Sequence, residues 1–126
     1  MNIEHIAIYV KDLEKSACFY EAYFQGKRNA LYVNPKTGFS SYFLSFSDSA
    51  RLELMNVPDI SESNDSARLG YAHIAFKVGS KAEVDKLTAQ LQKDGYSVRS
   101  YPRTTGDGYY ESSVYDPDGN VIEIME

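Results

Sequence analysis

The chain has 126 residues, of which 43% are hydrophobic and 25% charged, the composition of an ordinary globular protein. A formal net charge of -5 without any cluster of Lys or Arg argues against a nucleic-acid partner, and no stretch approaches the roughly 20 apolar residues of a membrane helix. The single cysteine and the first residues, which lack the basic and apolar regions of a secretory signal, lead us to expect a cytoplasmic protein.

The first predicted elements are a strand over residues 3–10 and a helix that follows it. Apolar side chains alternate with others along the strand. Asp12 is a suitable N-cap for a helix whose apolar residues recur at helical spacing between residues 13 and 24, and Gly26 stands at its C-terminal end. Cys18 falls inside this helix, where we expect it to be packed.

Three more strands are expected in the first half, near residues 30–33, 42–46 and 51–55. The stretch over residues 57–70 then changes character, because it is rich in Ser, Asp and Asn and has little apolar content. We interpret it as a linker or loop.

The second half repeats the plan of the first. The motif His-Ile-Ala occurs near the start of both halves, the second time within a predicted strand over residues 71–78. Ser80 and Glu83 form a capping-box pattern before a helix that Gly95 ends. Strands are expected near residues 97–101, 111–115 and 121–125. Each half therefore has the order strand, helix, strand, strand, strand.

This repetition predicts an α+β fold of two tandem βαβββ modules. Module one covers about residues 1–57, a linker covers about 58–69, and module two covers about 70–126. Because a half of about sixty residues would be only marginally stable alone, we expect one domain over residues 1–126.

Strand parity places four chemically notable side chains on matching faces. Since successive side chains of a strand point to opposite faces, apolar residues that suit packing under a helix leave their neighbours on the other face. The residues on that other face include His5, Glu53, His73 and Glu123. If the mixed sheets curve, four groups from matched positions of a doubled unit converge in a metal-binding cleft.

The pattern favours a metal site over isolated surface residues. A single His on a strand is more often packed or solvent-facing than a ligand, and a Glu on an edge strand is usually solvated. Here, however, the chain has only two histidines, both at the matched position, and each half also ends with a matched Glu. The mixed nitrogen and oxygen set predicts one divalent ion per site, Ni, Co or Zn, with Mn or Fe as alternatives.

Several neighbours of these residues are candidates for lining a substrate cleft. Arg51 and Met55 share the face of Glu53, while Tyr9 and Tyr71 share the faces of the two histidines. The alternative is that some of them lie in solvent at strand ends. Arg103 opens a glycine-containing segment that suits either a loop over the site or an ordinary hairpin connection.

The arrangement resembles a known family. Besides the four candidate ligands, the motifs that carry the resemblance are Val10-Lys11-Asp12-Leu13, Phe19-Tyr20 and Asp116-Pro117-Asp118-Gly119-Asn120. They are similar to those of glyoxalase I and its relatives in the vicinal oxygen chelate superfamily, which includes extradiol dioxygenases, fosfomycin resistance proteins and bleomycin-binding proteins. The resemblance implies paired βαβββ modules that close around a metal, and a homodimer.

The ligand set is most similar to that of glyoxalase I. The resemblance implies a lyase or isomerase that acts on a small α-oxo or α-hydroxycarbonyl substrate, with a thiol adduct as one option. It further implies Glu123 as the base that moves a proton between adjacent carbons, with Glu53 assisting. Two alternatives stay open: another metal-dependent enzyme of the superfamily, such as a dioxygenase or an antibiotic-modifying transferase, and a non-catalytic protein that sequesters a small molecule.

Overall fold

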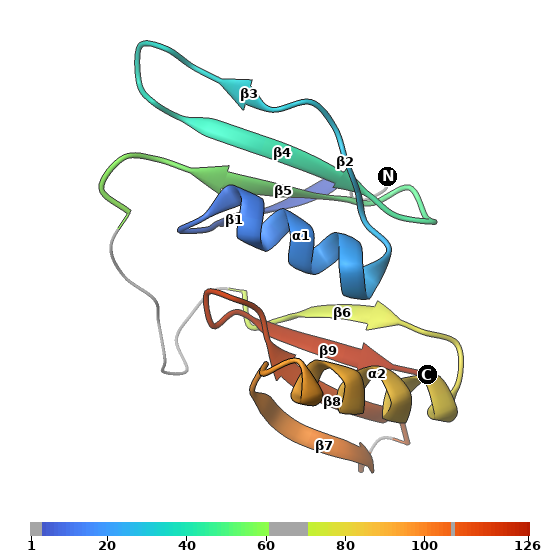
Figure 1. The fold of residues 1–126 in the computed structure, drawn as a ribbon. Helices are drawn as coiled ribbons and strands as arrows, with labels where there is room; N and C mark the ends of the chain where they lie inside the picture. The colour runs from blue at the N-terminus through green and yellow to red at the C-terminus, as the bar shows by residue number, and fades with distance from the viewer. Residues whose placement is uncertain (1–3, 61–70, 107) are drawn as a thin grey trace. The chain divides into compact units, whose positions relative to one another are not determined.

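Each half of the chain folds as one helix on one mixed sheet (Figure 1). The computed structural model describes residues 4–60, 71–106 and 108–126, so most of the predicted linker lies outside the described residues. The chain divides into two units, Met1–Glu62 and Ser63–Glu126. The predicted α+β class with two modules of the same plan is confirmed, and neither sheet closes into a barrel.

The first unit has a sheet in the order β1-β5-β4-β2, and β3 also pairs with β4. Its elements are β1 (His5–Tyr9), α1 (Leu13–Phe24), β2 (Lys27–Arg28), β3 (Tyr32–Val33), β4 (Ser40–Ser45) and β5 (Arg51–Asn56). β1 runs parallel to β5, and the other pairs are antiparallel. The single strand expected near residues 30–33 is thus replaced by two strands of two residues each.

The ends of α1 follow local sequence chemistry. Asp12 is the N-cap, and its carboxylate accepts a hydrogen bond of 3.0 Å from the backbone N–H of Lys15. At the C-terminal end Gln25 adopts the left-handed conformation with φ 59°, directly before the Gly26 predicted to stand at this end. Gly26 meets a different requirement, because a Cβ there would lie 2.9 Å from Leu44 Cδ2. It lets the chain pass close to the core of the sheet.

The core of the first unit lies between α1 and the sheet. The side chains with at most 3% exposure include Ala17, Phe19 and Tyr20 from the helix and Leu44, Leu52 and Leu54 from β4 and β5. Cys18 is exposed, contrary to the expectation that it is packed. One residue along a helix turns the side chain by about 100°, so a residue between two buried neighbours can still face outward.

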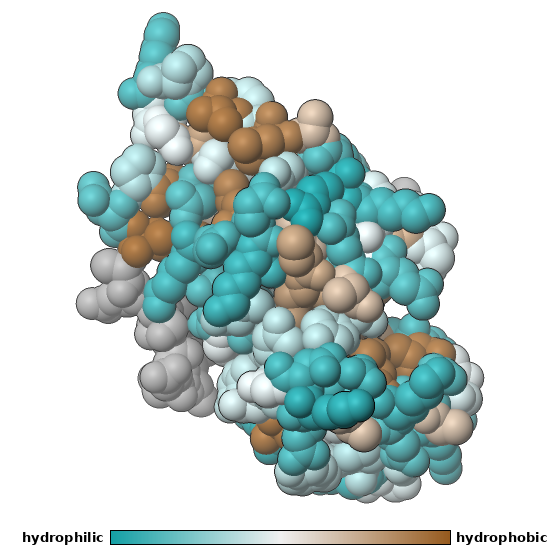
Figure 2. Space-filling model, viewed as in Figure 1, coloured by the Kyte–Doolittle hydropathy of each residue, from teal (hydrophilic) through white to brown (hydrophobic). Residues whose placement is uncertain are grey.

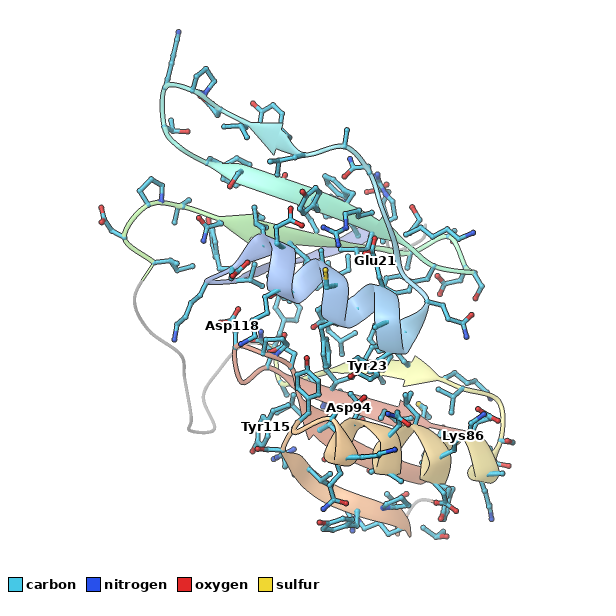
Figure 3. All side chains as sticks on the ribbon, viewed as in Figure 1. Glu21, Tyr23, Lys86, Asp94, Tyr115 and Asp118 are labelled. Atoms are coloured by element: carbon cyan, nitrogen blue, oxygen red, sulfur yellow. The ribbon has the colours of Figure 1, made fainter. Side chains whose placement is uncertain are left out.

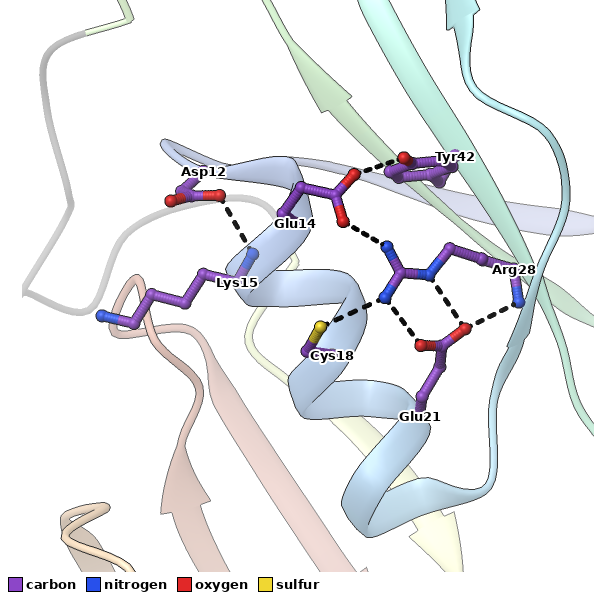
Figure 4. A network of polar contacts seen from close by, with 7 residues as sticks. All are labelled: Asp12, Glu14, Lys15, Cys18, Glu21, Arg28 and Tyr42. Atoms are coloured by element: carbon purple, nitrogen blue, oxygen red, sulfur yellow. Dashed lines mark hydrogen bonds and ion pairs between the residues drawn. The ribbon is translucent and has the colours of Figure 1, made fainter.

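A polar network ties α1 to β2 and β4 (Figure 4). The guanidinium of Arg28 donates to both carboxylate oxygens of Glu21, at 2.9 and 2.7 Å, and to Glu14 at 2.7 Å. It also contacts Cys18 Sγ at 3.2 Å, while the hydroxyl of Tyr42 donates to Glu14. The hydrogen bonds from Arg28 hold the pKa of Glu21 below its usual value. The network therefore contributes stability only while its carboxylates are ionised.

The ion pair between Glu21 and Arg28 makes the free energy of unfolding depend on pH in a way that can be tested. Because the pKa of Glu21 is lowered in the folded state, its contribution is present above the ordinary value of 4.5 and is lost as the pH falls through the folded value. We expect Glu21→Gln to lower the free energy of unfolding by about 0.5–1 kcal/mol at pH 7, with the difference from wild type shrinking in acid. Urea unfolding at pH 7 and at pH 3 to 4 measures this.

The matched control is Glu83→Gln on the second helix. Lys86 projects from that helix (Figure 3) and lies 3.7 Å from Glu83 as an exposed pair. We expect a change of about 0.5 kcal/mol or less there, because exposed pairs contribute little. A Glu21 effect that persists unchanged in acid would contradict the role given to its charge.

The second unit has a sheet in the order β6-β9-β8-β7 with β6 parallel to β9. Its elements are β6 (Ile74–Lys77), α2 (Lys81–Lys93), β7 (Val98–Thr104), β8 (Tyr110–Tyr115) and β9 (Val121–Met125). Ser80 is the N-cap of α2, and Gly95, at φ 93°, follows its end. Both predicted helix boundaries are confirmed. The fully buried apolar side chains are Val84, Leu91, Val114, Ile122 and Ile124.

Apolar side chains also reach the surface around β3. Leu31, Tyr32 and Val33 are each about half exposed, and Figure 2 shows apolar atoms gathered over this end of the first unit. A strand of two residues offers little backbone for pairing with another chain, which is one way an edge is protected.

Neither helix in the described parts of the chain is long and apolar enough to cross a membrane.

Candidate functional site

In the first unit a histidine and a glutamate meet on the face of the sheet turned away from α1, which we call the open face. His5 begins β1, and Glu53 lies in β5 beside Ala7, two residues further along β1. His5 Nε2 lies 3.9 Å from Glu53 Oε2. Leu52 and Leu54, on either side of Glu53, are buried toward the helix. We call His5 and Glu53 the first half-site.

The second unit repeats this arrangement. His73 directly precedes β6, and Glu123 in β9 lies beside Ala75, again two residues beyond the histidine. His73 Nε2 lies 3.1 Å from Glu123 Oε2. Ile122 and Ile124 are fully buried, so Glu123 lies on the open face of its own sheet. We call His73 and Glu123 the second half-site.

The chemistry of these pairs fits a divalent metal. Each half-site offers one imidazole nitrogen and one carboxylate, a donor set that suits borderline or hard ions. Within the residues that the structure describes, no group of three or more His, Cys, Asp or Glu is placed to hold a metal ion. What the structure brings together is therefore each predicted His with the predicted Glu of its own unit. The convergence of all four ligands stays a prediction.

The two half-sites differ in the residue beside the glutamate. On β4, Phe43 lies beside Glu53, and its ring contacts the His5 ring edge-on with centroids 5.3 Å apart. On β8 the corresponding residue beside Glu123 is Ser113, which is 5% exposed. Neither residue was predicted from the sequence, although strand parity in β4 and β8 is the signal that identifies them.

The first half-site has a further polar contact that the sequence analysis missed. The carboxylate of Glu4 forms a hydrogen bond with His5 Nδ1 and accepts one from the guanidinium of Arg51. The same guanidinium lies over the ring of Phe43, 4.3 Å from its centroid. Arg51, predicted to line a cleft, thus lies on the open face beside the first half-site, where it is engaged by Glu4 and Phe43.

The other predicted cleft residues are distributed unevenly. Tyr9 and Met55 are partners in the β1–β5 pairing and follow the first half-site along its open face. Tyr71 is 93% exposed and precedes β6. Arg103 is exposed in β7 beside Glu111, two strands from the strand that carries Glu123. These four residues remain cleft candidates only as a prediction.

The segment after Arg103 forms a hairpin connection between β7 and β8. Within the described residues, the backbone N–H of Thr105 donates to the carbonyl of Tyr109 at 2.8 Å, and the Thr105 hydroxyl accepts from the Tyr109 N–H at 3.0 Å. Of the two interpretations considered for this segment, these contacts favour the hairpin.

Two Bacillus subtilis proteins are similar to the chain over nearly its whole length. One is YqjT, 28% identical over 98% of this chain and 97% of the relative. The other is a protein described as a "Probable trivalent organoarsenical cleaving enzyme", 32% identical over 99% of this chain and 80% of the relative.

Solved structures show the same fold. The trypanothione-dependent glyoxalase I of Leishmania major matches with a TM-score of 0.79 and 25% identity, over 100% of this chain and 86% of its own. Glyoxalase I of Zea mays, at 21% identity, matches with a TM-score of 0.81 over 98% of this chain, which spans only 43% of the maize chain. The sequence profile of one family matches residues 2–124. The chain thus belongs to the Glyoxalase/Bleomycin resistance protein/Dioxygenase superfamily.

Proposed function

We propose that the chain is a metal-dependent lyase or isomerase of the glyoxalase type, acting on a small α-oxo or α-hydroxycarbonyl compound. The observation that carries the proposal is the repeated half-site: a histidine Nε2 faces a glutamate carboxylate in both units, with the glutamate beside the residue two positions after the histidine. Two unrelated surface pairs would have no reason to share this register.

In the proposed site His5, Glu53, His73 and Glu123 hold one divalent ion, Ni, Co or Zn before Mn or Fe. When bound, the metal acts as a Lewis acid toward the oxygen atoms of the substrate. The carboxylate of Glu123 takes a proton from the carbon next to the carbonyl and returns it to the neighbouring carbon. Glu53 assists from the other side. The cleft candidates Tyr9, Arg51, Met55, Tyr71 and Arg103 would line the substrate site.

The superfamily relatives support the choice of substrate class. Glyoxalase I of Leishmania major, 25% identical, is trypanothione-dependent, which makes a thiol adduct a reasonable substrate to test here. We further propose a homodimer in the cytoplasm, in line with the expectations from sequence. The substrate need not bind through ionic contacts alone, since the open face of the first sheet also carries the aromatic side chains of Phe43 and Tyr9.

Metal analysis combined with an activity assay tests the proposal. We expect about one metal ion per chain after reconstitution with Ni, Co or Zn, and its loss in His5→Ala and in His73→Ala. Turnover of methylglyoxal should then be assayed with glutathione, trypanothione and other thiols. Metal binding with turnover supports the proposal. A wild-type chain that stays metal-free at saturating metal would contradict it and leave a sequestering protein.

One relative favours a second candidate, cleavage of a trivalent organoarsenical, because that Bacillus subtilis protein is 32% identical to the chain. Trivalent arsenic is a soft centre that binds best to thiolates, by the same preference that governs soft metals. The single cysteine, Cys18, lies on α1 beside Arg28, on the helix side of its sheet. This placement favours the glyoxalase-type proposal. Incubation of the metal-loaded chain with a trivalent aryl arsenical, with release of inorganic arsenic as the readout, separates the two.

A further inference from the structure

The ring of His5 is contacted on both of its nitrogens. Nδ1 bonds to the carboxylate of Glu4, while Nε2 faces Glu53 at 3.9 Å. Glu4 is itself held twice by Arg51, whose guanidinium donates to its other carboxylate oxygen and whose backbone N–H donates to its carbonyl at 2.9 Å. An ionised carboxylate carries no proton and can only accept, so the Nδ1 atom of His5 must carry the hydrogen.

We propose that Glu4 is a positioning residue for His5: it holds the proton on Nδ1, leaves the lone pair on Nε2, and turns that atom toward Glu53 as a metal ligand. The metal part rests on the proposed function. A carboxylate that accepts from the far nitrogen of a ligating histidine fixes its tautomer and ring orientation and increases its basicity. Arg51 acts behind Glu4 by holding the carboxylate in place.

The second half-site does not have this arrangement. Ala72 precedes His73 where Glu4 precedes His5, and Val121 stands at the register position of Arg51. Neither side chain has a polar group. His73 instead has its Nε2 atom 3.1 Å from Glu123. The carboxylate on Nδ1 thus belongs to the first half-site, and the glutamate proposed to move protons belongs to the second.

Nitrogen NMR of the two histidines tests the positioning role without any metal. In ¹⁵N-histidine-labelled protein only two rings give signals, and His5→Ala assigns them. At a pH where both rings are neutral, we expect His5 to be the Nδ1–H tautomer in wild type. Glu4→Ala should shift it toward the Nε2–H tautomer. Glu4→Gln should retain the wild-type tautomer, because the amide oxygen accepts the same hydrogen bond.

His73 and the exposed helix variant Glu83→Gln are the matched controls. The His73 signals should not change in any Glu4 variant, and Glu83→Gln should leave both rings as in wild type. Circular dichroism verifies that each variant is folded. A His5 ring that keeps the Nδ1–H tautomer in folded Glu4→Ala would overturn the positioning role.

Zinc titration tests the metal part separately. We expect the Kd for zinc to rise about 10- to 100-fold in Glu4→Ala, as for other partners of ligating histidines, and less in Glu4→Gln. Unchanged zinc affinity in Glu4→Ala would overturn the inference for the metal. Absence of zinc, nickel and cobalt binding by wild type would instead overturn the proposed function, and the tautomer measurement would still decide what Glu4 does to His5.

Discussion

Replacing Glu123 by Gln is expected to lower kcat by about 10²- to 10⁴-fold while the metal remains bound, the range typical of a lost general base. The amide keeps an oxygen that can coordinate a metal, but it cannot accept the proton of the substrate. Steady-state kinetics on protein of known metal content measures the effect. The metal content shows whether a lower kcat comes from slower proton transfer or from a smaller fraction of metal-loaded protein.

Glu53→Gln is the matched control for Glu123→Gln, because the two residues occupy the same register position in the two units. We expect a smaller loss there, in keeping with an assisting role. If Glu123→Gln turns over at the wild-type rate, Glu123 is not the base. If only Glu53→Gln loses activity, the two carboxylates exchange their proposed roles.

Leu54→Ala is expected to lower the free energy of unfolding by about 2–5 kcal/mol, the usual cost of a large-to-small change in a core. Leu54 is fully buried in β5, which lies between β1 and β4, and its side chain faces α1. The loss is a large share of the roughly 5–15 kcal/mol that stabilises a typical folded protein. Urea unfolding followed by circular dichroism measures it.

Met55→Ala, one residue along the same strand, is the control for Leu54→Ala. Its side chain points to the open face of the sheet and is only partly buried. We expect a loss of about 1 kcal/mol or less, because less apolar area is removed from contact. Equal losses for the two variants would contradict the assignment of the two faces, and with it the placement of Glu53 on the open face.

Strand parity is what made the half-sites predictable from sequence. In both Leu52-Glu53-Leu54 and Ile122-Glu123-Ile124 the apolar residues flank a carboxylate. In a strand with one buried face, the apolar residues must point to that face and the carboxylate to the opposite one. The structure buries all four of these apolar side chains. The capping residues Asp12 and Ser80 were equally predictable, because N-caps depend on local chemistry.

Other features depend on register, which periodicity does not supply. Glu4 meets Arg51 only because β1 and β5 pair in parallel with His5 beside Arg51, a contact between residues 47 apart in sequence. Parity places Phe43 on the open face but does not predict that its ring packs against His5. Strands as short as β2 and β3 contain too few residues to show an alternation of apolar and polar side chains. The convergence of the four ligands follows only from the doubling of the unit and stays a prediction.

The parallel pairing within each unit also determines when its half-site can form. The histidine lies on or directly before the first strand of a module and the glutamate on the last, and parallel neighbours cannot be joined by a hairpin. Each histidine–glutamate pair therefore joins residues far apart in the sequence, and proteins rich in such contacts fold slowly. An unfolded chain has no preformed half-site, so a metal that binds only the native state would raise the free energy of unfolding by mass action. If the proposed site holds a metal, we thus expect the lifetime of this protein in the cell to follow the supply of that metal.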